Sequence, residues 1–264
     1  MDKEFFRIIF VVLVYRNTQD LLDFFKYNII EDSKVIVVNS YFDEKTDALF
    51  RKIAFDNDAE FISVPNKGYG AGNNRGIEYA LEKYKFDYLI ISNADITIQT
   101  FSFKELEKYG DCIIAPRLRA RGGKNQNPSS PFKPFKIIEK LLYKVYEGNH
   151  DKIVILFYVW SRLNKIIYYL ISRFRKKIYS PHGAFFIIPY DILKKIVPIY
   201  NERTFLFYEE HHLGKLLYSK KIKVIYVPSI VINHKEDGSV SFLEVNNFKL
   251  MKDGYMTYYD YWYR

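Results

Sequence analysis

The chain is poor in cysteine and in long apolar segments. One cysteine among 264 residues excludes a disulfide framework and a cysteine-based zinc cluster, and it fits a reducing compartment. No uninterrupted apolar run reaches the roughly 18 residues of a membrane span. The run at 8–14 follows the acidic residues Asp2 and Glu4, and no small-residue cleavage site comes after it. We therefore expect a buried strand there rather than the core of a signal peptide.

Basic residues exceed acidic ones, but the excess is local. The chain has 40 Lys and Arg against 31 Asp and Glu, a formal net charge of +9. The segment 136–177 holds ten basic and three acidic residues and therefore carries +7 of that total. A charge confined to one segment does not favour a nucleic-acid footprint over the whole surface, so we predict no nucleic-acid partner. It does favour a local anionic partner.

The first 116 residues alternate between short apolar runs and helical patterns. The runs predict buried parallel strands over 8–14, 35–38, 60–64, 88–91 and 112–115. Apolar residues at helical spacing predict helices over 18–28, 43–55, 71–84 and 101–108. This alternation predicts an α/β fold with a mostly parallel central sheet flanked by helices.

The second half is less regular. Its pattern predicts a loop over 117–134, helix over 136–177, strands over 183–189, 223–227 and 230–234, and a helix over 207–219. No internal repeat is present. We therefore predict a single domain over 1–264, with a basic helical insertion at about 132–178 and an aromatic, basic C-terminal tail at 241–264.

Polar residues directly follow the apolar run at 88–91. They are Asn93, Ala94 and Asp95. Ligands of open α/β sheets bind at the carboxyl ends of strands, and a carboxylate there can hold a divalent metal whose shell substrate phosphates complete. The alternative is that Asp95 only caps the following segment.

A glycine-rich stretch at 66–76 precedes a predicted helix. Glycines at a helix N-terminus allow the backbone to approach a phosphate. The stretch follows the third predicted strand rather than the first, and Asn73 stands where a dinucleotide-binding fingerprint would have its last glycine. It also lacks the Gly-Lys-Ser/Thr of a Walker loop. Alone, it identifies no ligand.

Two adjacent carboxylates, Glu209 and Glu210, begin the helix predicted over 207–219. A helix N-terminus favours ionised carboxylates, so they can supply a general base, although a plain acidic first turn is common. Next to them, His211 and His212 point about 100° apart and cannot both face one metal ion. His234 ends a predicted strand, where a lone histidine is more often structural than a ligand.

Taken in chain order, these motifs resemble the inverting family 2 glycosyltransferases of the GT-A fold. The likeness is to the rhamnosyltransferase-like enzymes of bacterial capsule and O-antigen assembly in particular, and it runs from about residue 8 to 240. The residues that carry it are Tyr15-Arg16-Asn17, Asn39-Ser40, Asn66-x-Gly68-x-Gly70, Asn73-Asn74, Asn93-x-Asp95, His182-Gly183, Glu209-Glu210 and His234.

The resemblance implies a role for each motif. It implies transfer of a sugar from a UDP- or dTDP-linked donor to a hydroxyl of a glycan or lipid-linked oligosaccharide. Glu210 is implied as catalytic base, and Asp95 and His234 as ligands of Mn²⁺ or Mg²⁺. The implied donor-binding residues are Tyr15, Asn17, Asn39, Asn66, Gly68, Gly70, Asn73, Asn74, Asn93 and Asp95, and the acceptor-site residues are His182, Gly183 and Glu209. Several positions depart from the family pattern: Tyr15 replaces Thr, Asn93 stands at the first position of Asp-x-Asp, and Asn39, Glu210 and His212 stand where the family commonly has Asp.

Two other functions compete with this one. A sugar-1-phosphate nucleotidyltransferase would carry a glycine-rich basic loop after the first strand, and 15–20 contains no glycine. A non-catalytic membrane-binding or anion-binding module could be built around the basic insertion.

The insertion contains an apolar stripe at helical spacing. Its members are Ile153, Leu156, Trp160, Leu163, Ile167, Leu170 and Phe174. A basic amphipathic helix of this kind can lie in the interface of an anionic membrane. The alternatives are that the stripe packs on the sheet or forms a homodimer. The local charge favours the membrane, which predicts a cytoplasmic protein bound peripherally at the inner face of the plasma membrane.

Overall fold

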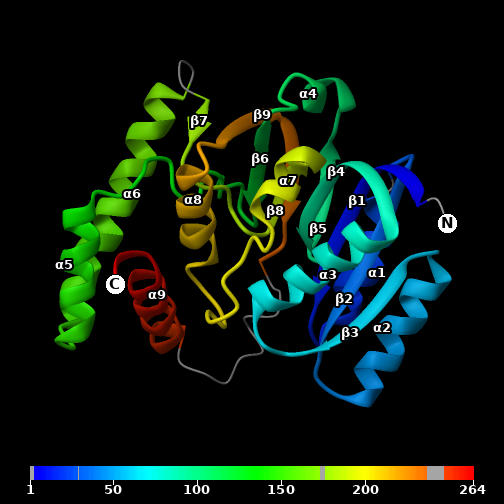
Figure 1. Cartoon of the computed structure of the whole chain (residues 1–264), viewed down its shortest axis with the longest axis horizontal. Helices are drawn as coiled ribbons and strands as arrows, with labels where there is room; N and C mark the ends of the chain where they lie inside the picture. Colours follow the sequence, from blue (N-terminus) through cyan, green and yellow to red (C-terminus); the bar gives the residue numbers. More distant parts are fainter. Residues whose placement is uncertain (1–2, 29, 173–175, 237–246) are drawn as a thin grey trace.

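The chain folds into one α/β unit built on a single sheet (Figure 1). The computed structural model describes residues 3–28, 30–172, 176–236 and 247–264. Its first half alternates strands and helices: β1 (Glu4–Val14), α1 (Thr18–Tyr27), β2 (Ser33–Tyr41), α2 (Glu44–Asp56), β3 (Glu60–Pro65), α3 (Tyr69–Lys83), β4 (Tyr84–Asn93), β5 (Ile96–Thr100), α4 (Phe103–Glu107) and β6 (Cys112–Ala120).

The second half adds the insertion, the last strands and a C-terminal helix. Its elements are α5 (Lys136–Glu147), the short 3₁₀ helix η1 (Asp151–Ile153), α6 (Val154–Ile171), β7 (Lys177–Ile178), β8 (Phe185–Pro189), α7 (Tyr190–Ile196), α8 (Glu209–Ser219), β9 (Lys223–His234) and α9 (Asn247–Tyr263). In Figure 1, α5, α6 and α9 lie at the end of the molecule opposite α2.

The strands are ordered β3-β2-β1-β4-β8-β6-β9-β5, and β7 pairs with β9. β3, β2, β1 and β4 are parallel, as the continuous apolar runs predict. β8 then runs antiparallel to both β4 and β6. The sheet is therefore mixed rather than mostly parallel, because the chain returns from the insertion in the opposite direction. The predicted class, a central sheet flanked by helices, is confirmed.

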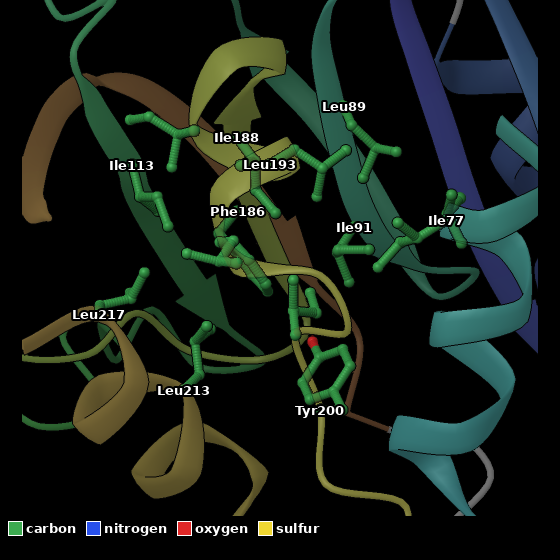
Figure 2. Packing of buried hydrophobic residues seen from close by; sticks show 14 of the residues in the cluster. Ile77, Leu89, Ile91, Ile113, Phe186, Ile188, Leu193, Tyr200, Leu213 and Leu217 are labelled. Carbon is green, nitrogen blue, oxygen red and sulfur yellow. The ribbon is translucent and has the colours of Figure 1, made fainter. Parts of the chain in front are cut away.

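Both faces of the sheet are covered by helices. One face packs against α1, α2 and α4 through side chains such as Leu21 and Phe50. The other packs against α3, α7 and α8. Figure 2 shows that second layer, where Phe186 and Ile188 of β8 face Leu193 and Leu213. These layers fix the carboxyl ends of β1 and β4 relative to the start of α8.

Several predicted boundaries are wrong in the second half. The predicted loop at 117–134 begins too early, because β6 continues to Ala120 and pairs with β9. Arg117 and Arg119 alternate there with the buried Leu118 and Ala120, a pattern that hides a strand among charges. The two predicted strands over 223–234 are one strand, β9, interrupted by a register shift. The short elements β5 and α7 were not predicted.

The predicted C-terminal tail is a helix, and its predicted basic character is wrong. Over 247–264 it has three basic and two acidic residues and is nearly neutral; 241–246 lie outside the described residues. α9 packs on α5 and α8 through a cluster of buried tyrosines, Tyr143, Tyr146, Tyr255 and Tyr258. Tyr255 Oη donates a hydrogen bond to the backbone carbonyl of the buried Glu139 at 2.6 Å, and Tyr258 Oη donates to its Oε1 at 2.5 Å. The tyrosines thus satisfy a carboxylate inside an aromatic cluster.

The apolar stripe of α6 does not pack on the sheet. Six of its members are exposed, from 43% for Ile153 to 76% for Leu170; Phe174, like Arg173 and Arg175 of the basic segment, lies outside the described residues. The side of α6 that meets the domain carries the buried Val154 and Tyr168. Among the described residues, α6 is the one helix long and apolar enough to cross a membrane. Its two buried residues, Val154 near one end and Tyr168 near the other, contact the rest of the domain.

Candidate active site

A cavity of about 600 Å³ opens at the carboxyl ends of β1 and β4. Eleven of the candidate residues predicted from the sequence line its walls: Tyr15, Asn17, Asn66, Gly68, Asn93, Asp95, His182, Gly183, Glu209, Glu210 and His234. They come from every part of the chain between β1 and β9, so the fold is needed to assemble them. Four other candidates, Asn39, Gly70, Asn73 and Asn74, are not among the lining residues.

Asp95 and His234 form a pair on one wall. Asp95 is 4% exposed, and its Oδ2 lies 3.2 Å from His234 Nε2. On the other side of the ring, His234 Nδ1 lies 2.7 Å from Gln126 Oε1. Gln126 Nε2 donates to Glu236 Oε1 at 2.7 Å, which fixes the amide with its oxygen toward the histidine. The neutral ring therefore carries its hydrogen on Nδ1.

This tautomer leaves the lone pair of His234 Nε2 facing a carboxylate oxygen. Asp95 Oδ2 is buried and has no hydrogen-bond partner among the described residues. Two electron-rich atoms 3.2 Å apart repel each other unless a proton on Nε2 or a metal cation lies between them. No group of three or more His, Cys, Asp or Glu side chains that could hold a metal occurs in the described part of the chain. A pair of protein ligands fits Mn²⁺ or Mg²⁺, which take the rest of their shell from phosphates and water.

Glu209 and Glu210 enter the cavity from the first turn of α8. Glu210 Oε1 accepts a hydrogen bond from the backbone N–H of Gly183 at 3.1 Å. A Cβ at position 183 would lie 3.2 Å from the same oxygen, so glycine allows this close approach. Glu209 is 5% exposed, and its Oε1 has no partner in the described residues. Burial, with the charge of Glu210, raises the pKa of Glu209 to about 8.

The two carboxyl groups therefore differ at neutral pH. With a pKa of about 8, Glu209 is mostly protonated and cannot accept a proton. Glu210 is anchored by a hydrogen bond from the backbone N–H of Gly183. The geometry thus separates two residues that are equivalent in the sequence pattern.

The carboxylates are presented by a turn with unusual backbone angles. Phe207 and Tyr208 both have positive φ, 70° and 66°. The Tyr208 ring packs 5.0 Å from that of Tyr255 on α9. A Cβ at Gly254 of α9 would lie only 2.8 Å from the Phe207 carbonyl oxygen, so helix and turn are in direct backbone contact. The turn that begins α8 is therefore packed directly against α9, through Gly254 and Tyr255.

His211 and His212 act inside the protein rather than in the cavity. His212 Nδ1 accepts a hydrogen bond from Trp262 Nε1 of α9 at 3.1 Å, and its Nε2 lies 3.3 Å from Thr204 Oγ1. Burial lowers the pKa of His212 to about 3, so the ring is neutral. This histidine links α8 to the C-terminal helix, and its neighbour contacts Tyr208 and Tyr258.

His182 lies between the two walls of the cavity. Burial lowers its pKa to about 4, so the ring is neutral. Its Nδ1 accepts from the backbone N–H of Ala184 at 3.1 Å, and its own backbone N–H donates to Asn127 Oδ1 at 2.7 Å. The ring centre is 6.0 Å from that of His234. His182 therefore joins the Asp95 side of the cavity to the Glu210 side.

Most of the glycine-rich stretch packs against protein. A Cβ at Gly68 would lie 2.1 Å from the Phe205 carbonyl oxygen, and the φ of Gly68 is +102°. Asn74 Nδ2 donates to the Tyr200 carbonyl at 3.0 Å, and Asn73 Nδ2 donates to the carbonyl of Tyr69, also at 3.0 Å. The stretch therefore holds the loop before α8, and only its start faces the cavity.

Asn39 is also used internally. It is 1% exposed, and its Nδ2 donates to Asp47 Oδ1 at 2.8 Å. Sequence reasoning missed Asp20, Gln126 and Asn247, which line the cavity. Asp20 lies three residues after the candidate Asn17, a spacing that could have drawn attention to it. Its Oδ2 accepts a hydrogen bond from Asn17 Nδ2 at 2.6 Å. Gln126 and Asn247 gave no local sequence signal.

Comparison with known proteins identifies the fold. No family model matches the chain. The low-salt glycan biosynthesis hexosyltransferase Agl10 of Haloferax volcanii is 23% identical over 207 residues, which cover 76% of this chain and 58% of that protein. The chain thus spans little more than half the length of this relative.

Two solved structures share the architecture. GalNAc-T7, crystallised with UDP, GalNAc and Mn²⁺, has a TM-score of 0.58 at 12% sequence identity. The match covers 89% of this chain and 44% of the GalNAc-T7 chain. Residues 1–349 of Staphylococcus aureus TarS, in complex with UDP-GlcNAc, give a TM-score of 0.55 at 14% sequence identity. This match covers 90% of this chain and 62% of the TarS chain. The chain has the GT-A fold, which confirms the predicted fold class.

Proposed function

We propose that the protein is an inverting glycosyltransferase that moves a sugar from a UDP- or dTDP-linked donor to a hydroxyl of a glycan or lipid-linked acceptor. One observation carries the proposal: a single cavity in a GT-A fold brings the Asp95–His234 pair together with the anchored carboxylate of Glu210. The name of the Haloferax relative, a hexosyltransferase, and the UDP and UDP-GlcNAc held by the two structural neighbours support it.

Asp95 and His234 would hold Mn²⁺ or Mg²⁺. Such an ion, when bound, neutralises the diphosphate leaving group. The buried, unpartnered Oδ2 of Asp95 and the lone pair of His234 Nε2 support this assignment. On the same wall, Asn93, Asn17 and Tyr15 line the cavity and are available to bind the donor.

Glu210 would act as the general base. Its carboxylate takes the proton of the acceptor hydroxyl while the acceptor oxygen forms a bond to the anomeric carbon. The bond from that carbon to the diphosphate oxygen breaks on the opposite face, and the electron pair leaves with the diphosphate. One displacement inverts the anomeric configuration, so the protein supplies no nucleophile. Gly183 would orient the base, and the protonated Glu209 and the neutral His182 are available to donate hydrogen bonds to the acceptor.

The proposed setting is bacterial surface polysaccharide synthesis, of the rhamnosyltransferase-like type that builds capsule or O-antigen. The protein would act at the cytoplasmic face of the plasma membrane as a peripheral protein. The exposed stripe of α6 and the local charge of +7 support membrane contact. A homodimer that covers the same stripe is the alternative.

The test is turnover of labelled nucleotide sugars by the purified protein. Glu210→Gln should lower turnover by roughly 10²–10⁴-fold, the usual contribution of a general base, and leave donor affinity within about twofold. Glu209→Gln is the matched control and should lose less, because Gln reproduces the protonated form of that side chain. Equal losses would contradict the assignment of the base.

A panel of UDP-, dTDP- and GDP-sugars with Mn²⁺ identifies the donor. Binding of none of them would overturn the proposal. A nucleotidyltransferase would instead release pyrophosphate from a nucleoside triphosphate and a sugar phosphate, which the same preparations can reveal.

A further inference from the structure

A second cavity, of about 500 Å³, lies at the C-terminal end of α6. Its polar lining consists of Arg117, Asn125, Tyr169, Ser172, Lys176 and Tyr226. It shares a wall with the candidate active site, because Asn125 lines this cavity while the next residue, Gln126, lines the first. The proposed reaction uses none of its side chains.

Among the described residues, the lining is cationic and contains no carboxylate. Arg117 on β6 has no ion pair with any described residue, and Lys176 Nζ reaches only the hydroxyl of Tyr109, at 3.3 Å. Glu105 lies near Lys176, but its carboxylate already binds Lys108 and accepts from Ser229 Oγ at 3.0 Å. Arg117 therefore has no neutralising carboxylate among the described residues, and Lys176 has only the shared carboxylate of Glu105 near it.

The neutral groups complete a site for an oxyanion. Tyr226 Oη accepts a hydrogen bond from Asn125 Nδ2 at 2.7 Å, so its own hydrogen is available to the cavity. Asn125 Oδ1 is buried and has no partner in the described part of the chain, so it can accept from a hydroxyl beside the anion. Guanidinium, ammonium and phenol are the donors that bind phosphate oxygens.

The position of the cavity favours an amphiphile over a free anion. Tyr169 and Ser172, on its wall, belong to the same last turns of α6 as Leu170, which is 76% exposed, and Ile166 and Ile167, which are also exposed. The α6 hydroxyls are held in place, since Tyr169 Oη donates to the Asn127 carbonyl at 2.7 Å. A cationic cavity beside an exposed apolar helix matches a headgroup attached to acyl chains.

We propose that this cavity binds the phosphate of an anionic phospholipid, with the acyl chains beside the exposed apolar face of α6. The inference deepens the proposed function, because it rests on the proposed membrane location and names the lipid chemistry that α6 meets. It requires no sugar transfer.

The experiment measures binding to phosphatidylcholine vesicles with and without phosphatidylglycerol. The double variant Arg117→Gln/Lys176→Gln should bind the anionic vesicles about thirtyfold more weakly than the unmodified protein. The control, Lys195→Gln/Lys220→Gln, removes the same charge from exposed lysines outside the cavity and should stay within about threefold. Equal losses in the two double variants would show general charge attraction only and overturn the site, as would no loss in either.

Two further arms separate the remaining outcomes. Soluble glycerol phosphate that binds as tightly as the vesicles would identify a free phosphate ester as ligand and overturn the lipid. Tyr226→Phe, a milder change, should weaken vesicle binding about fivefold, and it replaces the double variant if that fails to fold. Donor turnover is measured on the same samples. A protein without turnover that still shows the cavity-dependent binding refutes the proposed function and supports the lipid site.

Discussion

Glu209→Gln should stabilise the protein at alkaline pH. The side chain is buried and faces Glu210 and the hydroxyl-bearing rings of Tyr69 and Tyr200. Its pKa is about 8 in the folded protein, against 4.5 for an ordinary glutamate, with burial as the main cause and the charge of Glu210 as the second. Gln has the shape of the protonated acid and never ionises, so the substitution removes only the titration.

The sign and size follow from proton linkage. Because the folded pKa is raised, the native state holds a proton that the unfolded state releases above pH 4.5. Stability is therefore lost as pH rises from 4.5 toward 8, and the loss is complete above 8. The difference between the two pKa values corresponds to at most about 5 kcal/mol. For a chain of this size that is a melting temperature lower by roughly 10 °C.

The assay is thermal unfolding of both proteins between pH 5 and pH 9.5. Their difference should be small at the acidic end and should grow in favour of Glu209→Gln up to about pH 8 or 9. Glu82→Gln removes an exposed carboxyl on α3 and should follow the unmodified protein throughout. Parallel profiles for all three proteins would refute the reasoning, because Glu209 would then ionise normally and could itself serve as base.

Three other predictions concern metal, membrane and turn. Asp95→Ala should lose the dependence of nucleotide affinity on Mn²⁺, measured by calorimetry; full affinity of the unmodified protein in excess chelator would contradict the metal site. Trp160→Glu should weaken sedimentation with anionic vesicles and leave donor hydrolysis unchanged. If the unmodified protein fails to sediment at low salt, the membrane role is wrong and the apolar stripe is better explained as a dimer interface. Gly254→Ala puts a Cβ 2.8 Å from the Phe207 carbonyl and should lower kcat about tenfold or more at constant donor affinity. Gly110→Ala should not, because its Cβ would make only an ordinary contact, 3.9 Å from the Glu107 carbonyl oxygen.

The central strands of the first half were predictable because both of their faces are buried. The apolar runs at 8–14 in β1 and 88–91 in β4 are continuous, and such runs have few alternative interpretations. Prediction failed where burial is one-sided or the element is short. β5 has only five residues. The end of β6 alternates arginines with buried residues, and this pattern was interpreted as a loop. The antiparallel placement of β8 depends on the path of the whole insertion, which no local pattern encodes.

The site was predictable in its composition but not in its geometry. Chain-order motifs gave Asp95, Glu210 and His234, and these three do meet in one cavity. The pattern could not show that Asn39 and Asn74 are already occupied by hydrogen bonds inside the protein. It also could not separate Glu209 from Glu210, because that difference comes from burial and from one backbone N–H donor.

The unusual backbone before α8 explains why the C-terminal helix belongs to the site. Two consecutive non-glycine residues at positive φ, Phe207 and Tyr208, cost about 1–2 kcal/mol each, and such a turn persists only where its surroundings enforce it. Gly68 contacts the loop just before the turn, whereas Gly254 contacts the turn itself from α9.

The insertion completes this support. α9 rests on α5 through the tyrosines around Glu139, and it holds α8 through the hydrogen bond from Trp262 to His212. α5 and α9 therefore form one structural unit with the start of α8. A change in α5 or α9 reaches Glu210 through the turn without passing through the sheet. The C-terminal helix α9 thus packs directly against the turn that presents the proposed base.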